Sequence, residues 1–113
     1  MNEASVAYFG IVVFELGKVD GSGLYYREDF YLVQARDELS AKASVEGLAK
    51  EQEYEPGDST DRSFVRLKAV VDVAPTLREV SGDRVDLYSR HFASFDTYSS
   101  LEMKLGGHDP LAE

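Results

Sequence analysis

A helix with a single apolar stripe, bracketed by two strands, is the feature that most constrains this chain. Between residues 37 and 53 the apolar side chains recur at i, i+4, i+7 and i+8, which places them on one side of a helix. These residues are Ala41, Val45, Leu48 and Ala49. Asp37 precedes the stripe and is predicted to cap the helix through its carboxylate. Because an apolar stripe must be buried, we expect the helix to pack on a sheet formed by the flanking strands.

Two strands are predicted before the helix. Residues 5–16 are apolar at both odd and even positions, which indicates a strand covered on both faces, with Gly10 at a bulge or a close backbone approach. The glycine-rich residues 17–23 predict a hairpin loop. In the strand over residues 25–36, apolar residues alternate with charged residues and tyrosine, so we expect its apolar side to face the core. That apolar side consists of Tyr26, Phe30 and Leu32.

Two further strands are predicted after the helix, at residues 62–73 and 84–94. The first alternates so that one side is expected to meet the helix; this side consists of Val65, Leu67, Ala69, Val71 and Val73. Together with Val45 and Leu48, we expect Leu67 and Val71 to be almost fully buried. The fold class predicted is therefore α+β, a four-stranded antiparallel sheet in ββαββ order packed on one long helix.

A short C-terminal helix is predicted over residues 97–105, with Thr97 as its cap and Tyr98, Leu101 and Leu105 on one side. A helix this short is marginal alone, so it should be ordered only if it docks. Phe92 and Phe95 are the expected landing surface. The chain is interpreted as one domain, residues 1–113, with a core over about 5–95 and an extension over 96–113.

Charge and composition exclude several classes of function. The formal net charge is −9, which disfavours direct binding to nucleic acid or to anionic membranes and is compatible with a basic partner surface. The sequence has no cysteine and no apolar run long enough to span a bilayer, so we expect a cytoplasmic protein without disulfides or thiolate metal sites. The only histidines, His91 and His108, match no metal-binding spacing. We predict no metal, no cofactor and no catalytic residue, and enzymatic activity is disfavoured.

The order of the strands and several short runs resemble a known family. These runs are Phe14-Glu15, Tyr31-Leu32-Val33 with Ala35, Glu53-Tyr54, residues 64–73, and Val85-Asp86-Leu87-Tyr88-Ser89-Arg90 followed by Phe92. The order resembles the small bacterial proteins of the domain-of-unknown-function 4288 family, over about residues 6–92. The resemblance implies the fold and a bacterial origin but no activity, and the extension beyond residue 96 departs from the family.

Tyrosine and arginine are the residues most informative about function, because both are enriched where proteins bind one another. The candidate interaction surface consists of Tyr25, Arg27, Tyr31, Arg66, Tyr88, Arg90 and His91. The first hypothesis is a non-catalytic protein-interaction module, for example an immunity or toxin-neutralising protein, which also forms a homodimer. The alternative is a small-ligand-binding or enzymatic domain with a pocket near Tyr88, Arg90 and His91.

Overall fold

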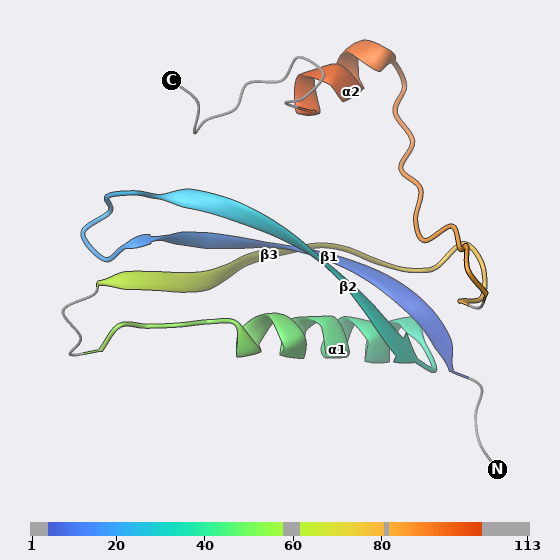
Figure 1. Ribbon diagram of the computed structural model, residues 1–113, viewed down its shortest axis with the longest axis horizontal. Helices are drawn as coiled ribbons and strands as arrows, with labels where there is room; N and C mark the ends of the chain where they lie inside the picture. Colours follow the sequence, from blue (N-terminus) through green and yellow to red (C-terminus); the bar gives the residue numbers. More distant parts are fainter. Residues whose placement is uncertain (1–4, 58–61, 81, 103–113) are drawn as a thin grey trace.

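The computed structural model describes residues 5–57, 62–80 and 82–102, and shows a three-stranded antiparallel sheet with a helix on one face. The elements are β1 (Val6–Lys18), β2 (Tyr25–Ala35), α1 (Glu38–Glu51), β3 (Ser63–Pro75) and α2 (Phe95–Leu101). The strand order is β2-β1-β3, so β1 is central. In Figure 1, α1 lies on one side of the sheet and α2 on the other. Among the described helices, none is long and apolar enough to cross a membrane.

The predicted hairpin of β1 and β2 is confirmed, with an uninterrupted register from Val6 opposite Ala35 to Leu16 opposite Tyr25. Its loop contains two glycines at positive φ, Gly21 at 89° and Gly23 at 64°. Residues with a Cβ atom rarely adopt this conformation, so glycine allows the chain to reverse here. The central position of β1 explains why both of its faces are apolar, as expected from the sequence.

Asp37 caps α1 as predicted, because its carboxylate accepts a hydrogen bond of 2.7 Å from the backbone amide of Ser40. Ala41, Val45 and Ala49 are completely buried against the sheet. Leu48, by contrast, is 37% exposed, so the prediction that it is almost fully buried is wrong. Small residues at every fourth position bring the helix axis close to the sheet. The burial therefore centres on the i, i+4, i+8 row, and the i+7 position lies at its margin.

The register of β3 shifts twice against β1, once between Ile11 and Val12 and once between Val13 and Phe14. Each shift inserts an extra residue and changes which side chains face the helix. The prediction of one continuous face on β3 is therefore wrong in its middle: Ala69 lies opposite Val13 on the far side of the sheet, and Val71 is 44% exposed. Val65 and Leu67 pack at the edge of the core and are only partly buried, so the near-complete burial predicted for Leu67 is also wrong; Val73 returns to the core.

β2 turns its more polar side toward the helix layer, contrary to expectation. Tyr31 lies opposite Gly10 and packs against the core, whereas Phe30 lies on the other face of the sheet. The reason is local to the hairpin. Ala35 and Val33 must face α1, which begins three residues later, and alternation then assigns Tyr31, Asp29 and Arg27 to the same side.

The fourth predicted strand is absent: within residues 84–94 the structure assigns no strand, and the sheet has three strands rather than four. This segment rises from one end of the sheet toward α2, on the side opposite α1, instead of lying beside a strand (Figure 1). Its backbone therefore has no strand to pair with. The short helix that follows is capped by Ser94 rather than Thr97, and ends at Leu101. Leu105, predicted on its apolar side, lies outside the described residues.

Candidate functional site

The sheet face opposite α1 carries a row of apolar side chains and is called the open face. It is formed by Phe9, Ile11 and Val13 of β1 and by Tyr26, Glu28, Phe30 and Leu32 of β2. The side chains of β2 are the more accessible: Tyr26 is 53% exposed, Phe30 60% and Leu32 49%. Phe30 and Leu32 are neighbours on this face, Glu28 separates them from Tyr26, and each of the three apolar side chains is left about half in water.

The crossing segment, residues 85–92, is anchored to the open face through Tyr88. The ring of Tyr88 stacks on Phe9 with centroids 4.8 Å apart and planes at 16°, and Phe9 is in turn 5.3 Å from the ring of Phe30. The Tyr88 hydroxyl donates a hydrogen bond to the carboxylate of Asp72 on β3. This hydrogen bond, together with partial burial, raises the pKa of Tyr88 above its ordinary value. The segment is therefore held by one stacked ring and one charge-assisted hydrogen bond.

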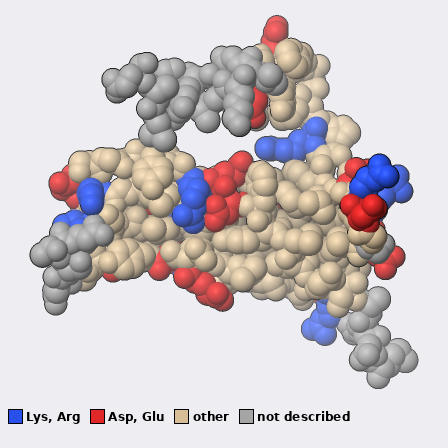
Figure 2. All heavy atoms as spheres, viewed as in Figure 1, with Lys and Arg blue, Asp and Glu red and all other residues tan. Residues whose placement is uncertain are grey.

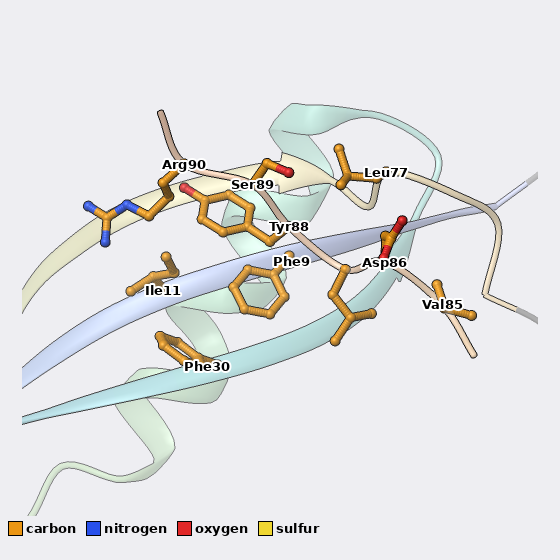
Figure 3. A pocket seen from close by; sticks show the side chains of 10 residues that line it. Phe9, Ile11, Phe30, Leu77, Val85, Asp86, Tyr88, Ser89 and Arg90 are labelled. Atoms are coloured by element: carbon orange, nitrogen blue, oxygen red, sulfur yellow. The ribbon is translucent and has the colours of Figure 1, made fainter. Parts of the chain in front are cut away.

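Two hollows flank the anchored tyrosine, with volumes of about 690 and 650 Å³. Both are lined by Phe30, Tyr88 and Arg90, so they are neighbours along the open face; we call them together the open-face groove. Figure 3 shows the first hollow, where the rings of Phe9, Phe30 and Tyr88 lie together and the Arg90 side chain extends to one side. In the space-filling view a gap separates the sheet layer from α2 (Figure 2).

The second hollow is bordered by α2, although none of the described residues of that helix is buried. Tyr98 meets Phe92 edge to face at 5.0 Å, so the predicted contact with Phe92 is present. Phe95, also predicted as landing surface, is instead the first residue of the helix and lies 6.2 Å from Tyr98 within it. Phe95 and Leu101 remain 69% and 58% exposed. The helix thus overhangs the groove rather than closing it.

The structure divides the predicted interaction surface between the two faces of the sheet. Tyr25, Arg27 and Tyr31 belong to the side that faces α1, although Arg27 at the sheet edge also lines the second hollow. There the guanidinium of Arg27 lies 4.8 Å from the centroid of Phe14 and pairs with Asp29 at 2.9 Å. The Tyr31 hydroxyl is buried without a hydrogen-bond partner among the described residues, and burial raises the pKa of Tyr31.

The remaining four predicted residues lie elsewhere. Arg66 is engaged with its own chain, because it pairs with Glu55 at 2.9 Å and covers the ring of Phe64 at 4.2 Å. Tyr88 and Arg90 line the groove, as the alternative hypothesis required. His91 is exposed and lines neither hollow. In the described part of the chain, no three His, Cys, Asp or Glu side chains come close enough to hold a metal ion.

Sequence reasoning missed Phe9, Phe30 and Tyr98 as residues of the site. The alternation in β2 did separate Phe30 and Leu32 from the charged residues, but it was interpreted as a core face. Only the direction in which α1 returns to the hairpin decides which face is covered.

The fold and the groove define a small α+β domain with one face of its sheet covered by its own helix and the other only partly covered. The chain belongs to the family described as domain of unknown function (DUF4288), whose model matches residues 7–89. The match confirms the resemblance in the sequence and ends before α2, so this helix lies outside it. No curated protein and no solved structure matches the chain significantly.

Proposed function

We propose that this chain is a non-catalytic protein-interaction module whose open-face groove binds a segment of a partner protein. The observation that carries the proposal is the exposure of Tyr26, Phe30 and Leu32, which are 49–60% exposed although they alternate with residues that the helix layer covers. Exposed apolar side chains that adjoin one another mark protein interaction sites more often than isolated ones do.

The groove has the composition of an interface core. Aromatic and aliphatic side chains make up most of its lining, and the tyrosines combine a large apolar area with a polar end. Its two hollows are open to solvent and are separated by Tyr88 and Arg90. They suit two apolar side chains of one partner segment, bound on either side of the crossing segment.

The charges favour a basic partner. The whole chain carries a formal net charge of −9, and the groove is lined by three acidic residues, Glu28, Asp86 and Glu102, and by two basic ones, Arg27 and Arg90. Opposite charge raises the rate of encounter and suppresses acidic competitors. The expected partner segment therefore combines apolar side chains with lysine or arginine. An immunity or toxin-neutralising protein that binds a basic toxin is one such case.

Affinity capture from the native host tests the proposal, with Phe30→Ser and Leu32→Ser compared with the wild-type chain. Leu39→Ser is the matched control, because Leu39 is 80% exposed on α1 and faces away from the groove. A protein retained by the wild type is identified by mass spectrometry, purified and titrated calorimetrically at low and high salt.

We expect each groove variant to weaken the purified complex about tenfold or more, the control to bind like the wild type, and high salt to weaken binding. Equal affinity of Phe30→Ser and the wild type contradicts the proposal, as does the absence of any protein that the wild type retains and the groove variants lose.

A second candidate function follows from the size of the first hollow. At about 690 Å³ it falls within the range of small-molecule sites, roughly 300–1,000 Å³. The rings of Phe9, Phe30 and Tyr88 and the guanidinium of Arg90 would suit an aromatic ligand with a carboxylate or phosphate group. Thermal-shift measurements with benzoate and phenyl phosphate test this. Stabilisation that is lost in Arg90→Gln supports ligand binding, and no shift in the wild type contradicts it.

A further inference from the structure

β2 presents an uncovered edge. It pairs with β1 on one side, and among the described residues no other strand or backbone hydrogen bond lies on its opposite side. The other edge of the sheet, formed by β3, is partly covered. Tyr54 and Val65 exchange two backbone hydrogen bonds of 2.9 Å, so the chain covers part of the outer side of β3 itself.

β2 also lacks most features that prevent an edge strand from pairing with another chain. Its eleven residues contain no proline and no lysine, and its register with β1 has no bulge. Natural edge strands are usually short, bulged or interrupted by such residues, because an open row of backbone donors and acceptors is a template for further strands. The charges of β2 lie at three consecutive positions, Arg27, Glu28 and Asp29, and leave residues 30–35 uncharged.

We propose that β2 pairs in antiparallel fashion with β2 of a second copy of this chain, about a two-fold axis at Phe30. The two sheets then form one continuous sheet of six strands. Both α1 helices lie on one side of it, and both open faces lie on the other. This inference names a partner, a second copy of the chain, and a surface, the backbone edge of β2; the Phe30 side chain belongs both to this surface and to the open-face groove.

The charges of β2 select the register. A two-fold axis perpendicular to the sheet pairs residues whose numbers add to an even sum, since only then do the side chains of a pair point to the same face. An axis at Glu28 or Asp29 sets that carboxylate directly opposite its own copy, which is destabilising. An axis at Phe30 pairs Tyr25 with Ala35 and thus uses all eleven residues.

In the Phe30 register each acidic residue meets an uncharged one. Glu28 lies opposite Leu32 of the second copy, and Asp29 opposite its Tyr31. The two Phe30 side chains meet at the axis, and each is 60% exposed in the single chain. The pairing therefore satisfies backbone groups of the edge and removes the most exposed ring of the open face from water.

Sedimentation of the purified chain tests the pairing, and cysteine cross-linking tests its register. The sequence contains no cysteine, so each introduced thiol is the only one in the chain. Phe30→Cys places two thiols opposite each other at the axis. Glu28→Cys is the matched control on the same face of the same strand. It lies four residues from its own copy, roughly 13 Å along the strand, which is too far for a disulfide.

A double variant, Glu28→Cys with Leu32→Cys, retains Phe30. It places the thiol at position 28 of each copy opposite the thiol at position 32 of the other copy. We expect the wild type to sediment as a dimer at about 100 µM. We also expect Phe30→Cys and the double variant to form covalent dimers under mild oxidation, and Glu28→Cys alone to remain largely uncross-linked. Circular dichroism and thermal melts show that each variant is folded.

A monomer at that concentration overturns the inference. So does a dimer in which neither Phe30→Cys nor the double variant cross-links, or one in which Glu28→Cys cross-links as fast as Phe30→Cys. These measurements use the purified chain alone. Failure to find a protein partner for the groove therefore leaves them unaffected, and the two proposals fail independently.

Discussion

Gly10 of β1 lies directly beneath Val45 of α1: a Cβ atom on Gly10 would stand 2.6 Å from Val45 Cγ2 and 3.0 Å from its Cγ1. Real Cβ atoms do not approach other carbons this closely. The contact sets how near the helix lies to the sheet. It also explains why the neighbouring buried residues of the stripe, Ala41 and Ala49, are small. Gly10 is thus the close backbone approach that the sequence suggested.

Gly10→Ala should therefore destabilise the fold. The added methyl group must push Val45 away from the sheet, and overpacking of this kind costs about 1–3 kcal/mol. Urea denaturation measures the change. Val45→Ala introduced into the Gly10→Ala background should recover part of the loss, because it removes the clashing methyl groups.

Gly47→Ala is the control for the Gly10 substitution and should raise stability by about 1 kcal/mol. Gly47 lies inside α1, and a Cβ atom there meets nothing within 4 Å. If Gly10→Ala is as stable as the wild type, the packing distance between α1 and β1 is not set by this pair.

The two apolar residues Val45 and Leu48 should differ in their contribution to stability. Val45 is completely buried, so Val45→Ala should lower the free energy of unfolding by about 2–3 kcal/mol. Leu48 is 37% exposed, and Leu48→Ala should cost only about 1 kcal/mol, less than the roughly 2–5 kcal/mol typical of a buried leucine. Chemical denaturation of both variants measures the two losses in the free energy of unfolding. A larger loss for Leu48→Ala would mean that the helix is rotated.

Asp37 should make stability depend on acid pH. The Ser40 amide, which donates to the Asp37 carboxylate, lowers the pKa of that group below 3.8 in the folded chain. The cap therefore contributes fully above the unfolded pKa, and the contribution is lost as pH falls through the folded value.

Melting temperatures of Asp37→Ala and Asp37→Asn separate the cap from its charge. At neutral pH we expect Asp37→Asn to resemble the wild type, because asparagine is also a good cap, and Asp37→Ala to melt lower. As pH falls below 3.8, the wild type should approach Asp37→Ala, whereas Asp37→Asn should keep its advantage. A pH-independent difference between wild type and Asp37→Ala would contradict the assignment.

Tyr88 should hold the crossing segment over the open face. Tyr88→Phe keeps the stack on Phe9 and removes the hydrogen bond to Asp72, whereas Tyr88→Ala removes both. Hydrogen exchange of the backbone amides of residues 85–90 should therefore be fastest in Tyr88→Ala and intermediate in Tyr88→Phe. Equal exchange in all three chains would show that the segment is held by other contacts.

The same hydrogen bond should weaken at alkaline pH. The pKa of Tyr88 is raised in the folded chain, so its contribution is present below the ordinary tyrosine pKa of about 10 and is lost as pH rises through the higher folded value. The difference in melting temperature between wild type and Tyr88→Phe should shrink over that range. A difference that persists well above it would contradict the assignment.

The sequence by itself determined the local elements of this protein. A continuous apolar run defined β1, and alternation defined β2 and β3. The glycine-rich loop joined the hairpin, and Asp37 with the Ala41–Val45–Ala49 row defined α1. Each of these elements depends on residues that are close together in the chain. A capping side chain bonds to an amide of its own first turn, and an apolar stripe repeats with a fixed period. Tyr88 and Arg90, which the sequence offered as candidate site residues, both line the open-face groove.

Tertiary structure alone decided which face of each strand is covered. The two register shifts in β3 expose Val71, and the return of α1 onto Val33 and Ala35 leaves Phe30 and Leu32 in water. The same alternation of apolar and polar residues fits either face. A bulge or the side from which the helix approaches is set by contacts between residues distant in the chain. Residues 84–94 show the same limit: a strand was predicted there, but a strand also needs a neighbouring strand whose backbone it can reach.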